Sequence, residues 1–354
     1  MRVLVVSQYL YRFPGGAEKY IREVCFQLKS QYAYDIHHLA TDCTNDLKIS
    51  RPVFKFFSSG INLNWFNEIP AILKSLNPDM IYLHYTVPGL CDVVQFFAKR
   101  MSIPSAVMYH SDVYGSKTIK RILGALYFKT VGRRIIKHSD IAFVSSIAYA
   151  RESKFLKELR TNFIEAPPGI RPDITDGKSL DCSPFILFVG EPDLREKGFD
   201  VLYRAFSSIN KAGESIKLVV VGNSSDKIPL PDVHCVGVIQ SDKELSNLYA
   251  SALVTVFPSL TLESFGLVTL EALVNACPVI VSNPGNSALL IRDGVNGYNV
   301  GPGDHQALRT AIEKVIKSHH QFRSNCLSMK SDLIHRYTWQ RTADCIHAEF
   351  EKYR

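Results

Sequence analysis

The sequence contains no uninterrupted apolar run of the roughly 18 residues that a membrane-spanning helix needs. It also contains no internal repeat and no low-complexity tract, and 46% of its residues are hydrophobic. These features exclude a polytopic membrane protein and a disordered chain. The opening residues, MRVLVVSQYL, resemble a signal peptide, but the apolar run is only about five residues long and no small-residue cleavage site follows. We therefore expect a first buried parallel strand there.

Cysteine is present, but never in the spacing of a metal site or a redox pair. None of the eight cysteines forms a C-x-x-C motif, and no group of His and Cys residues has ligand spacing. Cys25 and Cys277 lie in apolar segments, where a free thiol behaves as a small hydrophobe. We predict reduced thiols in a cytoplasmic protein. The cysteines are Cys25, Cys43, Cys91, Cys182, Cys235, Cys277, Cys326 and Cys345.

Two motifs that would indicate other chemistry are missing. No G-x-G-x-x-G follows a predicted strand, which argues against a dinucleotide oxidoreductase. No Asp-x-Asp motif and no His cluster stands where a divalent ion would bridge a diphosphate. We therefore expect neither a metal ion nor another cofactor.

The net charge of +7 is unevenly distributed along the chain. Residues 1–167 hold 22 Lys and Arg against 13 Asp and Glu, a balance of +9, whereas the remainder holds 19 against 21, a balance of −2. This asymmetry indicates an anionic partner for the first half, which a membrane surface, a phosphorylated acceptor or a nucleic acid would satisfy.

One stretch, Val113 to Ser139, concentrates this positive charge. It holds seven basic residues and no acidic one, interleaved with apolar residues in a helical rhythm. That composition is typical of a helix lying on an anionic membrane, and the alternative is an ordinary helix with a solvated basic face. No recognisable nucleic-acid module is present, so we favour the membrane. The basic residues are Lys117, Lys120, Arg121, Lys129, Arg133, Arg134 and Lys137.

A chain of 354 residues predicts two domains, and the order of its segments predicts their class. Short β-branched runs alternate with helical patterns, which is the signature of βαβ units and parallel sheets. The Pro- and Gly-rich segment Glu165 to Pro184 interrupts this alternation and is the predicted linker. We predict domains at 1–167 and 168–337, with a terminal helix at 338–354 completing the first. The predicted strands are 3–6, 36–40, 80–83, 106–109, 141–144, 185–189, 218–221, 254–257 and 279–282.

Two glutamates, Glu263 and Glu271, stand eight positions apart at a strand-to-helix junction. The strand ends at Phe257, and the helix is predicted to begin near Ser264 and to end before Pro278. Ligands of open α/β sheets bind beyond the carboxyl ends of the strands, and a helix N-terminus there favours phosphate. Carboxylates near a diphosphate would pair with sugar and ribose hydroxyls. The alternative is that Glu263 caps the helix electrostatically and Glu271 is a solvated helix residue.

The stretch PSLTLESFGLVTLEALVNACPVI, residues 258–280, strongly resembles the donor-site signature of retaining glycosyltransferase family four, whose members have the GT-B fold. Weaker pieces follow the order of the family: GGAEKYI at 15–21, YHSDV at 109–113, APPGI at 166–170, FVGEPDLREKGFDVL at 188–202, VVVGN at 219–223 and VGVIQSDKELSNLYASALVTVFPS at 236–259. The resemblance implies an α/β protein of two Rossmann-like, doubly wound domains facing each other across a cleft.

The resemblance also implies the residues of the donor site. Glu263 would contact the donor sugar and Glu271 the ribose hydroxyls, while Lys197 would offset charge on the leaving diphosphate. Gly15 and Gly16 would let backbone approach a phosphate or the acceptor. The remaining implied donor contacts lie in the loops after the strands and at the start of the helix: Gly190, Arg195, Gly222, Val238, Ile239, Ser264, Phe265, Gly266, Leu267 and Val268.

Three residues are implied on the sugar and acceptor side. His110 follows the run SAVMY and matches the histidine that contacts the transferred sugar near the reaction centre. Asp112 follows it in the same motif, and His84, in LHYTVP, is expected to line the acceptor side. Together with Glu263 and Lys197, His110 forms the predicted catalytic set.

The sequence departs from the pattern of the family at two places. Glu191 stands where relatives usually carry an arginine that clamps the diphosphate, and Arg195 in the same loop is a candidate substitute. In PGNSALL, Asn286 and Leu289 replace a glycine and a glutamate. These departures bear on the identity of the donor.

The resemblance therefore predicts a retaining, metal-independent hexosyltransferase. It would move a sugar from UDP or GDP to a glycan or lipid-linked acceptor in the assembly of polysaccharide or lipopolysaccharide. It would work in the cytoplasm, as a peripheral protein of the inner face of the plasma membrane, by front-face attack in which the leaving phosphate helps take the acceptor's proton. Two alternatives stay open: a weakly active nucleotide-sugar-binding scaffold, and a nucleotide-sugar 2-epimerase of the same fold.

Overall fold

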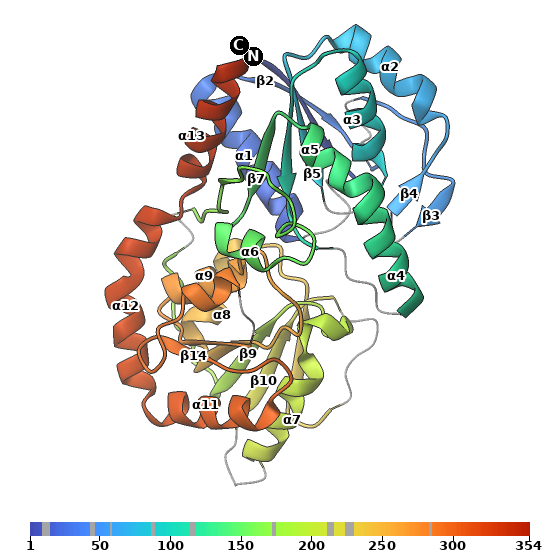
Figure 1. Ribbon diagram of the computed structural model, residues 1–354. Helices are drawn as coiled ribbons and strands as arrows, with labels where there is room; N and C mark the ends of the chain where they lie inside the picture. The colour runs from blue at the N-terminus through green and yellow to red at the C-terminus, as the bar shows by residue number, and fades with distance from the viewer. Residues whose placement is uncertain are drawn as a thin grey trace. The chain divides into compact units, whose positions relative to one another are not determined.

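A computed structural model describes residues 1–8, 15–42, 47–56, 59–85, 89–112, 118–171, 175–210, 216–223, 230–282 and 285–354 (Figure 1). The chain divides into two compact units. Unit 1 comprises Met1–Gly169 and Trp339–Arg354, and unit 2 comprises Ile170–Thr338. The domains expected from the sequence, 1–167 with 338–354 and 168–337, differ from these units by one or two residues at each boundary.

Unit 1 is built on a six-stranded sheet in which every neighbouring pair is parallel. Its order is β2-β1-β5-β6-β7-β8, so the chain starts near one side and crosses over to build the other. Strands β5 and β6 are fully buried and β1 is buried except for Arg2, because helices cover both faces, as expected for a parallel sheet. The strands are β1 Arg2–Ser7, β2 Asp35–Leu39, β5 Met80–Tyr85, β6 Ser105–Tyr109, β7 Ile141–Val144 and β8 Ile164–Glu165.

Two helices from opposite ends of the chain, α1 (Gly16–Tyr32) and α13 (Trp339–Phe350), cover one face of this sheet. Trp339, Ile346 and Phe350 of α13 are buried in the same core as Val24 and Leu28 of α1. Figure 1 shows the red terminal helix lying beside the blue first helix. The last helix is thus part of the core of unit 1.

The other face and the edges of unit 1 carry the remaining elements. A single helical run changes pitch at a π-helical turn, η1 (Phe128–Gly132), between α4 (Thr118–Tyr127) and α5 (Arg133–His138). The antiparallel hairpin of β3 (Phe54–Phe56) and β4 (Ser59–Ile61) was not predicted. The other helices are α2 Trp65–Leu76, α3 Leu90–Arg100, α6 Ile147–Glu152 and the short terminal η4 Glu351–Tyr353.

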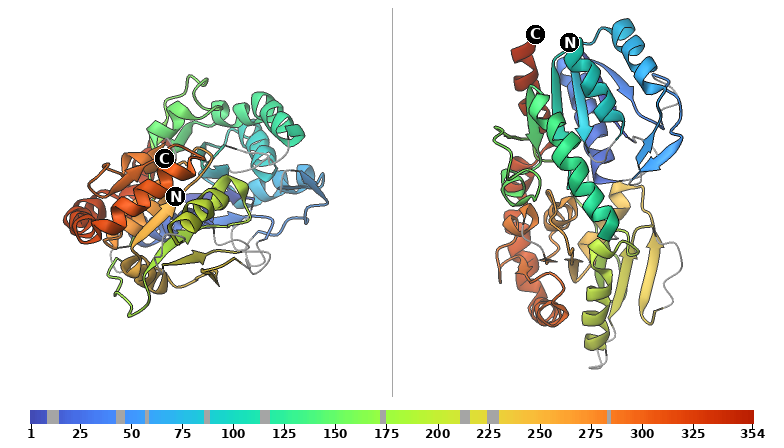
Figure 2. Two further views of the ribbon diagram at one scale, coloured as in Figure 1. Left: turned by 90° about the horizontal axis from the view of Figure 1, so that it is seen from below. Right: turned by 45° about the vertical axis from the view of Figure 1, so that its right-hand side comes forward.

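Unit 2 repeats this architecture with a second parallel sheet of order β11-β10-β9-β12-β13-β14. Helices α7 and α11 cover one face, and α8, α9 and α12 cover the other (Figure 2). The strands are β9 Phe185–Val189, β10 Lys217–Val221, β11 Val233–Gly237, β12 Val254–Phe257, β13 Val279–Val281 and β14 Gly297–Asn299. The helices are η3 Arg195–Lys197, α7 Phe199–Asn210, α8 Asp242–Ser251, α9 Leu267–Val274, α10 Asn286–Leu289, α11 His305–Lys317 and α12 His319–Arg336.

The two sheets confirm the predicted α/β class, but one helix boundary was wrong. Helix α9 begins at Leu267 rather than near Ser264. The cause is Gly266, which has a φ of 85° in the left-handed region and stands at the N-cap. A Cβ atom there would also overlap the hydroxyl of Ser287. Only glycine combines this backbone conformation with so close an approach.

No helix of the described part of the chain is long and apolar enough to cross a membrane.

Candidate functional site

Three loops meet beyond the carboxyl ends of the strands of unit 2. The N–H of Gly190, after β9, donates to the carbonyl of Val221, and the N–H of Gly222, after β10, donates to the carbonyl of Gly237 (2.8 and 2.9 Å). A Cβ atom on Gly222 would overlap the Gly190 carbonyl. These glycines therefore let the loops pack closely at the edge where ligands of such sheets bind.

Lys197 and Glu263, two of the predicted catalytic residues, lie together beyond the same edge of the sheet. The Lys197 Nζ lies 3.0 Å from the Glu263 Oε1, and both side chains are partly exposed, at 28% and 20%. The hydroxyl of Ser259 donates to the same carboxylate oxygen at 2.9 Å. Two donors thus hold one oxygen of Glu263 in place. Ser259 was not predicted, although it stands at the end of β12 within the signature stretch.

The lysine reaches this position because its loop is joined to the loop after β12. The N–H of Leu260 donates to the carbonyl of Glu196 at 2.7 Å. Gly198, with a φ of 68°, ends the short helix η3 so close to the Pro258 carbonyl that a Cβ atom would overlap it. A larger residue at this glycine would therefore displace the lysine.

The first turn of α9 follows directly after Glu263. The leading N–H groups of a helix have no partner inside the helix and carry a partial positive charge. Phe265 is buried, whereas Ser264, Leu267 and Val268 are half-buried. The backbone at the start of α9 therefore has the chemistry to accept anionic oxygens.

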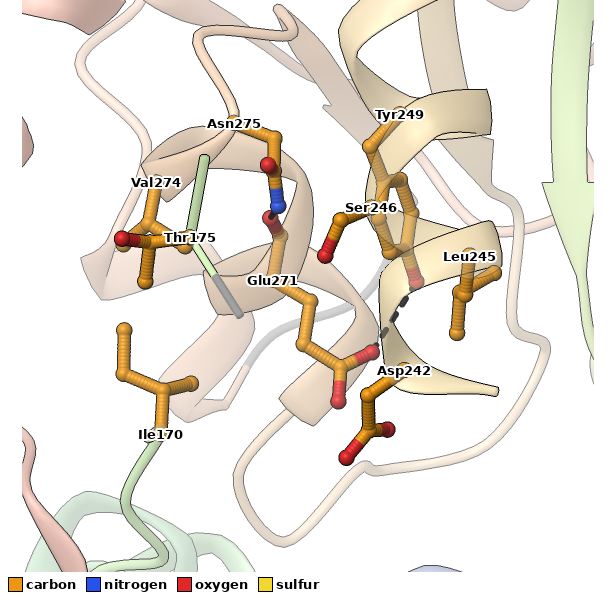
Figure 3. A pocket seen from close by; sticks show the side chains of 9 residues that line it. All are labelled: Ile170, Thr175, Asp242, Leu245, Ser246, Tyr249, Glu271, Val274 and Asn275. Carbon is orange, nitrogen blue, oxygen red and sulfur yellow. Dashed lines mark hydrogen bonds between the residues drawn. The ribbon is translucent and has the colours of Figure 1, made fainter. Parts of the chain in front are cut away.

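Glu271 is nearly buried about one turn further along α9, and the alternative of a solvated helix residue is wrong. The hydroxyl of Tyr249 donates to its Oε2 at 3.0 Å. Figure 3 shows this carboxylate pointing into a small pocket toward Asp242. Burial, followed by the nearby Glu271 carboxylate, raises the pKa of Tyr249 well above its usual value, so the phenol stays a hydrogen-bond donor. The pocket is lined by Ile170, Thr175, Asp242, Leu245, Ser246, Tyr249, Glu271, Val274 and Asn275.

The remaining predicted donor residues lie in the loops of unit 2. Val238 is exposed after β11, and Ile239 packs against the core. Glu191 and Arg195 are both exposed in the loop after β9. The side chain of Glu191 is thus open to solvent.

His110 and His84 lie together in unit 1, at the carboxyl ends of β6 and β5. The His84 Nδ1 lies 3.0 Å from the His110 Nε2, and Tyr20 of α1 packs edge-on against both rings. Burial lowers the pKa of His110 to about 3, and burial followed by the neighbouring His110 and His38 lowers that of His84 well below its ordinary value. Both imidazoles are therefore neutral.

The two expectations for the acceptor side need correction. The side chain of His84 is completely buried, so it cannot line an acceptor site in this conformation. Asp112 is buried as well, and its carboxylate accepts hydrogen bonds from the hydroxyls of Tyr109, Tyr149 and Ser153 (3.0, 3.0 and 2.6 Å). These donors favour a structural role that joins β6 to α6. Tyr149 and Ser153 are distant in sequence, so nothing local signalled this network.

Gly15 is the N-cap of α1, and Gly16 is its first residue. A Cβ atom on Gly15 would collide with the carboxylate of Glu18, which folds back over the start of the helix. Burial raises the pKa of Glu18 above its ordinary value. The backbone at Gly15, predicted to approach a phosphate or the acceptor, therefore lies next to a carboxylate of the same helix.

The basic stretch falls partly outside the described residues. Lys117 is outside them, and the side chains of Lys120 and Arg121 are not described. On α4, Ile122 and Leu126 are 61% and 58% exposed. Further along the same helical run, the basic side chains of Lys129, Arg134 and Lys137 are exposed, and Arg133 is half-buried.

Among the described residues, no group of three or more His, Cys, Asp or Glu side chains has the arrangement of a metal site.

Comparison with known proteins gives matches along nearly the whole chain. A family model described as Glycosyltransferase Family 4 matches residues 14–169, and one described as glycosyl transferases group 1 matches residues 174–328. The phosphatidyl-myo-inositol mannosyltransferase of Mycobacterium leprae is 22% identical over 99% of this chain and 96% of that protein. The D-rhamnosyltransferase WbpZ of Pseudomonas aeruginosa is 24% identical over 88% and 86%.

Solved structures share the fold. Sucrose-phosphate synthase from Thermosynechococcus elongatus has a TM-score of 0.78 at 20% identity, covering 99% of this chain and 98% of that one. HepE from Anabaena, solved with UDP and glucose, has a TM-score of 0.73 at 14% identity, covering 99% and 100%. With two parallel six-stranded sheets and these matches, the chain belongs to the family 4 glycosyltransferases of the GT-B fold, and it is a glycosyltransferase.

Proposed function

We propose that this protein transfers a hexose-type sugar, with retention of configuration and without a metal ion, from UDP or GDP to a glycan or lipid-linked acceptor in polysaccharide assembly. The observation that carries the proposal is the meeting of Lys197, Glu263 and the first turn of α9 in unit 2. The relatives named as mannosyl- and rhamnosyltransferases, and the HepE structure with UDP, support the classes of sugar and donor.

The charge chemistry at this site supports stabilisation of a leaving diphosphate. As the bond to the sugar breaks, negative charge grows on the phosphate oxygen that leaves. The Lys197 ammonium and the free N–H groups at the start of α9 supply positive charge to meet it. These groups do the electrostatic work that a divalent ion does in other transferases, which is why the proposal includes no metal.

The hydrogen bonds of Glu263 support retention through front-face attack. A carboxylate whose oxygen already accepts from Lys197 and Ser259 is a weakened nucleophile. It is well placed instead to accept hydrogen bonds from sugar hydroxyls through its remaining lone pairs. The proposed proton acceptor for the incoming hydroxyl is therefore the leaving phosphate.

The helical run from α4 to α5 supports an anionic membrane surface as a partner. Ile122 and Leu126, four residues apart, lie on one side of α4, and exposed basic residues follow within three turns. Apolar side chains that enter the interface, with basic side chains near phosphate headgroups, are typical of peripheral helices. A lipid-linked acceptor would then lie in the same membrane to which the enzyme binds.

The decisive test is a thermal-shift screen against UDP, GDP, ADP and their common sugar conjugates, in buffer with a chelator. We expect a rise of several degrees with one nucleotide, because a ligand that binds only the folded state stabilises it by mass action. The rise should disappear in Lys197→Ala and Glu271→Ala. Hydrolysis of the matching sugar nucleotide would then demonstrate chemistry.

A second candidate function is a scaffold that binds nucleotide sugar weakly, and Glu191 is the observation that favours it. A carboxylate in the loop after β9 repels a diphosphate rather than clamping it. Absence of a thermal shift with every nucleotide, followed by recovery of binding in Glu191→Arg, would favour this candidate over the transferase.

A further inference from the structure

His84 and His110 form a buried pair whose geometry bears on which of their ring nitrogens carry hydrogen. His84 lies on β5 and faces Met108 of β6 in the sheet register, and His110 follows two residues after Met108. Residues two apart along a strand point to the same face. The two rings therefore lie on one face of the sheet, under α1, with their centroids 5.2 Å apart.

Only one ring nitrogen of each histidine takes part in their hydrogen bond. The bond joins the His84 Nδ1 to the His110 Nε2 at 3.0 Å. The other nitrogen of His84, Nε2, is buried and has no hydrogen-bond partner among the described residues. His110 as a residue keeps 7% of its surface exposed, whereas His84 keeps none.

The unpartnered nitrogen indicates which histidine donates. A neutral imidazole carries one N–H and one bare nitrogen, and burial keeps both rings neutral. In protein backbones, buried N–H groups without a partner are rarer than under-satisfied acceptors, and we apply the same preference to the imidazole. This preference favours Nε2 as the bare nitrogen of His84, with the hydrogen on its Nδ1. The His84 Nδ1–H then donates to the His110 Nε2.

We infer that His84 is a positioning residue that holds His110 in the tautomer with hydrogen on Nδ1. Because the Nε2 of His110 accepts from His84, the hydrogen of its ring must sit on Nδ1. His110 then presents an N–H donor, and not a base, through its second nitrogen. Tyr20, packed edge-on against both rings at 5.3 and 6.0 Å between centroids, limits rotation of the pair.

This inference rests on the proposed function for its chemical consequence. If His110 contacts the transferred sugar, a fixed Nδ1–H donates a hydrogen bond to a sugar oxygen. A neutral donor places no full charge beside the reaction centre, and its orientation costs no reorganisation during the reaction. The acceptor's proton must then go elsewhere, which agrees with the leaving phosphate as its destination.

The first experiment reads the tautomer directly, without substrate. Two-bond ¹H–¹⁵N spectra of protein labelled at histidine distinguish a protonated ring nitrogen from a bare one, and His110→Asn assigns the signals of His110. We expect hydrogen on the His110 Nδ1 in the unmodified protein. Hydrogen on Nε2 would overturn the inference.

Matched variants at position 84 test the role of the donor. In His84→Asn an amide N–H stands near the place of Nδ1, whereas His84→Gln moves it one bond further out and His84→Leu removes it. We expect His84→Asn to keep the tautomer of His110, and the other two to lose it. An unchanged tautomer in all three would contradict the inference. Cys25→Ala, in the same core, controls for loss of packing.

Kinetics then separate this inference from the proposed function. With the donor found by the thermal-shift screen, His84→Leu should lower kcat about 10- to 100-fold, as loss of a supporting hydrogen bond does elsewhere. Nucleotide affinity should stay unchanged, and His84→Asn should restore much of kcat. If His110→Asn keeps full activity while the tautomer still depends on His84, the sugar-contact role fails and the positioning inference stands. Full activity in His84→Leu with loss of the tautomer, in an enzyme that His110→Asn impairs, would overturn the positioning role.

Discussion

At the scale of single residues, the ion pair of Lys197 and Glu263 is the feature with the most direct functional consequence. Each side chain is partly exposed and each satisfies the other in the absence of a donor. A diphosphate must compete with Glu263 for the lysine, so the two residues are coupled in binding as well as in chemistry.

Lys197→Ala should therefore weaken binding of the free nucleoside diphosphate by about 10- to 100-fold, because a hydrogen bond to a charged group contributes about 1.5–3 kcal/mol. Glu263→Gln should strengthen it slightly, since the lysine is released, while transfer is lost. Titration calorimetry measures both. Lys217→Ala, an exposed lysine at the opposite end of β10, is the control for lost charge. Equal affinities in Lys197→Ala and Lys217→Ala would contradict the assignment.

The buried, neutral His110 should make the protein sensitive to acid. Its pKa is lowered to about 3 by burial, whereas the unfolded chain binds the proton near pH 6.5. Above pH 6.5 the lowered pKa of His110 has no effect on stability. As the pH falls below this value the folded state loses stability, because the unfolded state then binds more protons. Between pH 7 and pH 5 His110 should lower the free energy of unfolding by about 2 kcal/mol.

Urea denaturation at the two pH values checks this expectation. His110→Asn should show a loss between pH 7 and pH 5 that is smaller by about the same amount. His335→Asn, on the exposed side of α12, should keep the full loss of the unmodified protein. An identical pH dependence in His110→Asn and the unmodified protein would exclude His110 as the cause.

At the scale of elements, the junction of β12 and α9 depends on one glycine. Gly266 has a φ of 85°, and a Cβ atom there would overlap Ser287. Gly303 has a comparable φ of 81° with nothing within 4 Å of a Cβ atom. Comparing Gly→Ala variants at the two positions therefore separates the cost of backbone strain from the cost of steric overlap.

Gly303→Ala should lower the free energy of unfolding by about 1 kcal/mol through strain alone. Gly266→Ala should lower it by about 2–4 kcal/mol, because overpacking adds to the same strain. It should also weaken nucleotide binding, since the first turn of α9 moves. Thermal denaturation and calorimetry give the two quantities, and equal losses of stability would show that Ser287 yields without cost.

At the scale of the whole molecule, the exposed apolar side chains of α4 bear on where the enzyme works. A double variant, Ile122→Ser with Leu126→Ser, should reduce affinity for vesicles of anionic phospholipid at least about tenfold, because burial of a leucine in lipid contributes about 1.5–3 kcal/mol. Co-sedimentation measures the affinity. Leu327→Ser, on the exposed side of α12, should bind like the unmodified protein. Equal binding by both variants would remove α4 from the membrane contact.

The short and polar elements show why part of the fold escaped prediction. Helix α12 buries only Phe322, Cys326 and Leu333 along 18 residues, so its apolar periodicity is faint. Strand β14 has three residues and exists because it pairs with β13 at the edge of the sheet. Such elements are stabilised by their neighbours more than by their own sequence.

In the candidate site, too, some features could be predicted from the sequence and others could not. The approximate places of Glu263 and Glu271 followed from one continuous signature, and that of Lys197 from a weaker piece at 188–202. Their partners did not, because Tyr249 and Ser259 approach them only after folding. The burial of His84 and Asp112 was not predicted for the same reason, since the burial of a polar residue depends on the packed unit and is not marked by its residue type.

The sequence by itself determined the class of the fold, because buried parallel strands require continuous β-branched runs and crossover helices, and both are visible in one dimension. It also determined the family, through residues that are neighbours along the chain. Only the tertiary structure decided which oxygen of Glu263 meets Lys197, which ring nitrogens of His84 and His110 meet, and that Asp112 is enclosed by hydroxyls. Such contacts join segments tens of residues apart, and close packing alone brings those segments within the reach of a hydrogen bond.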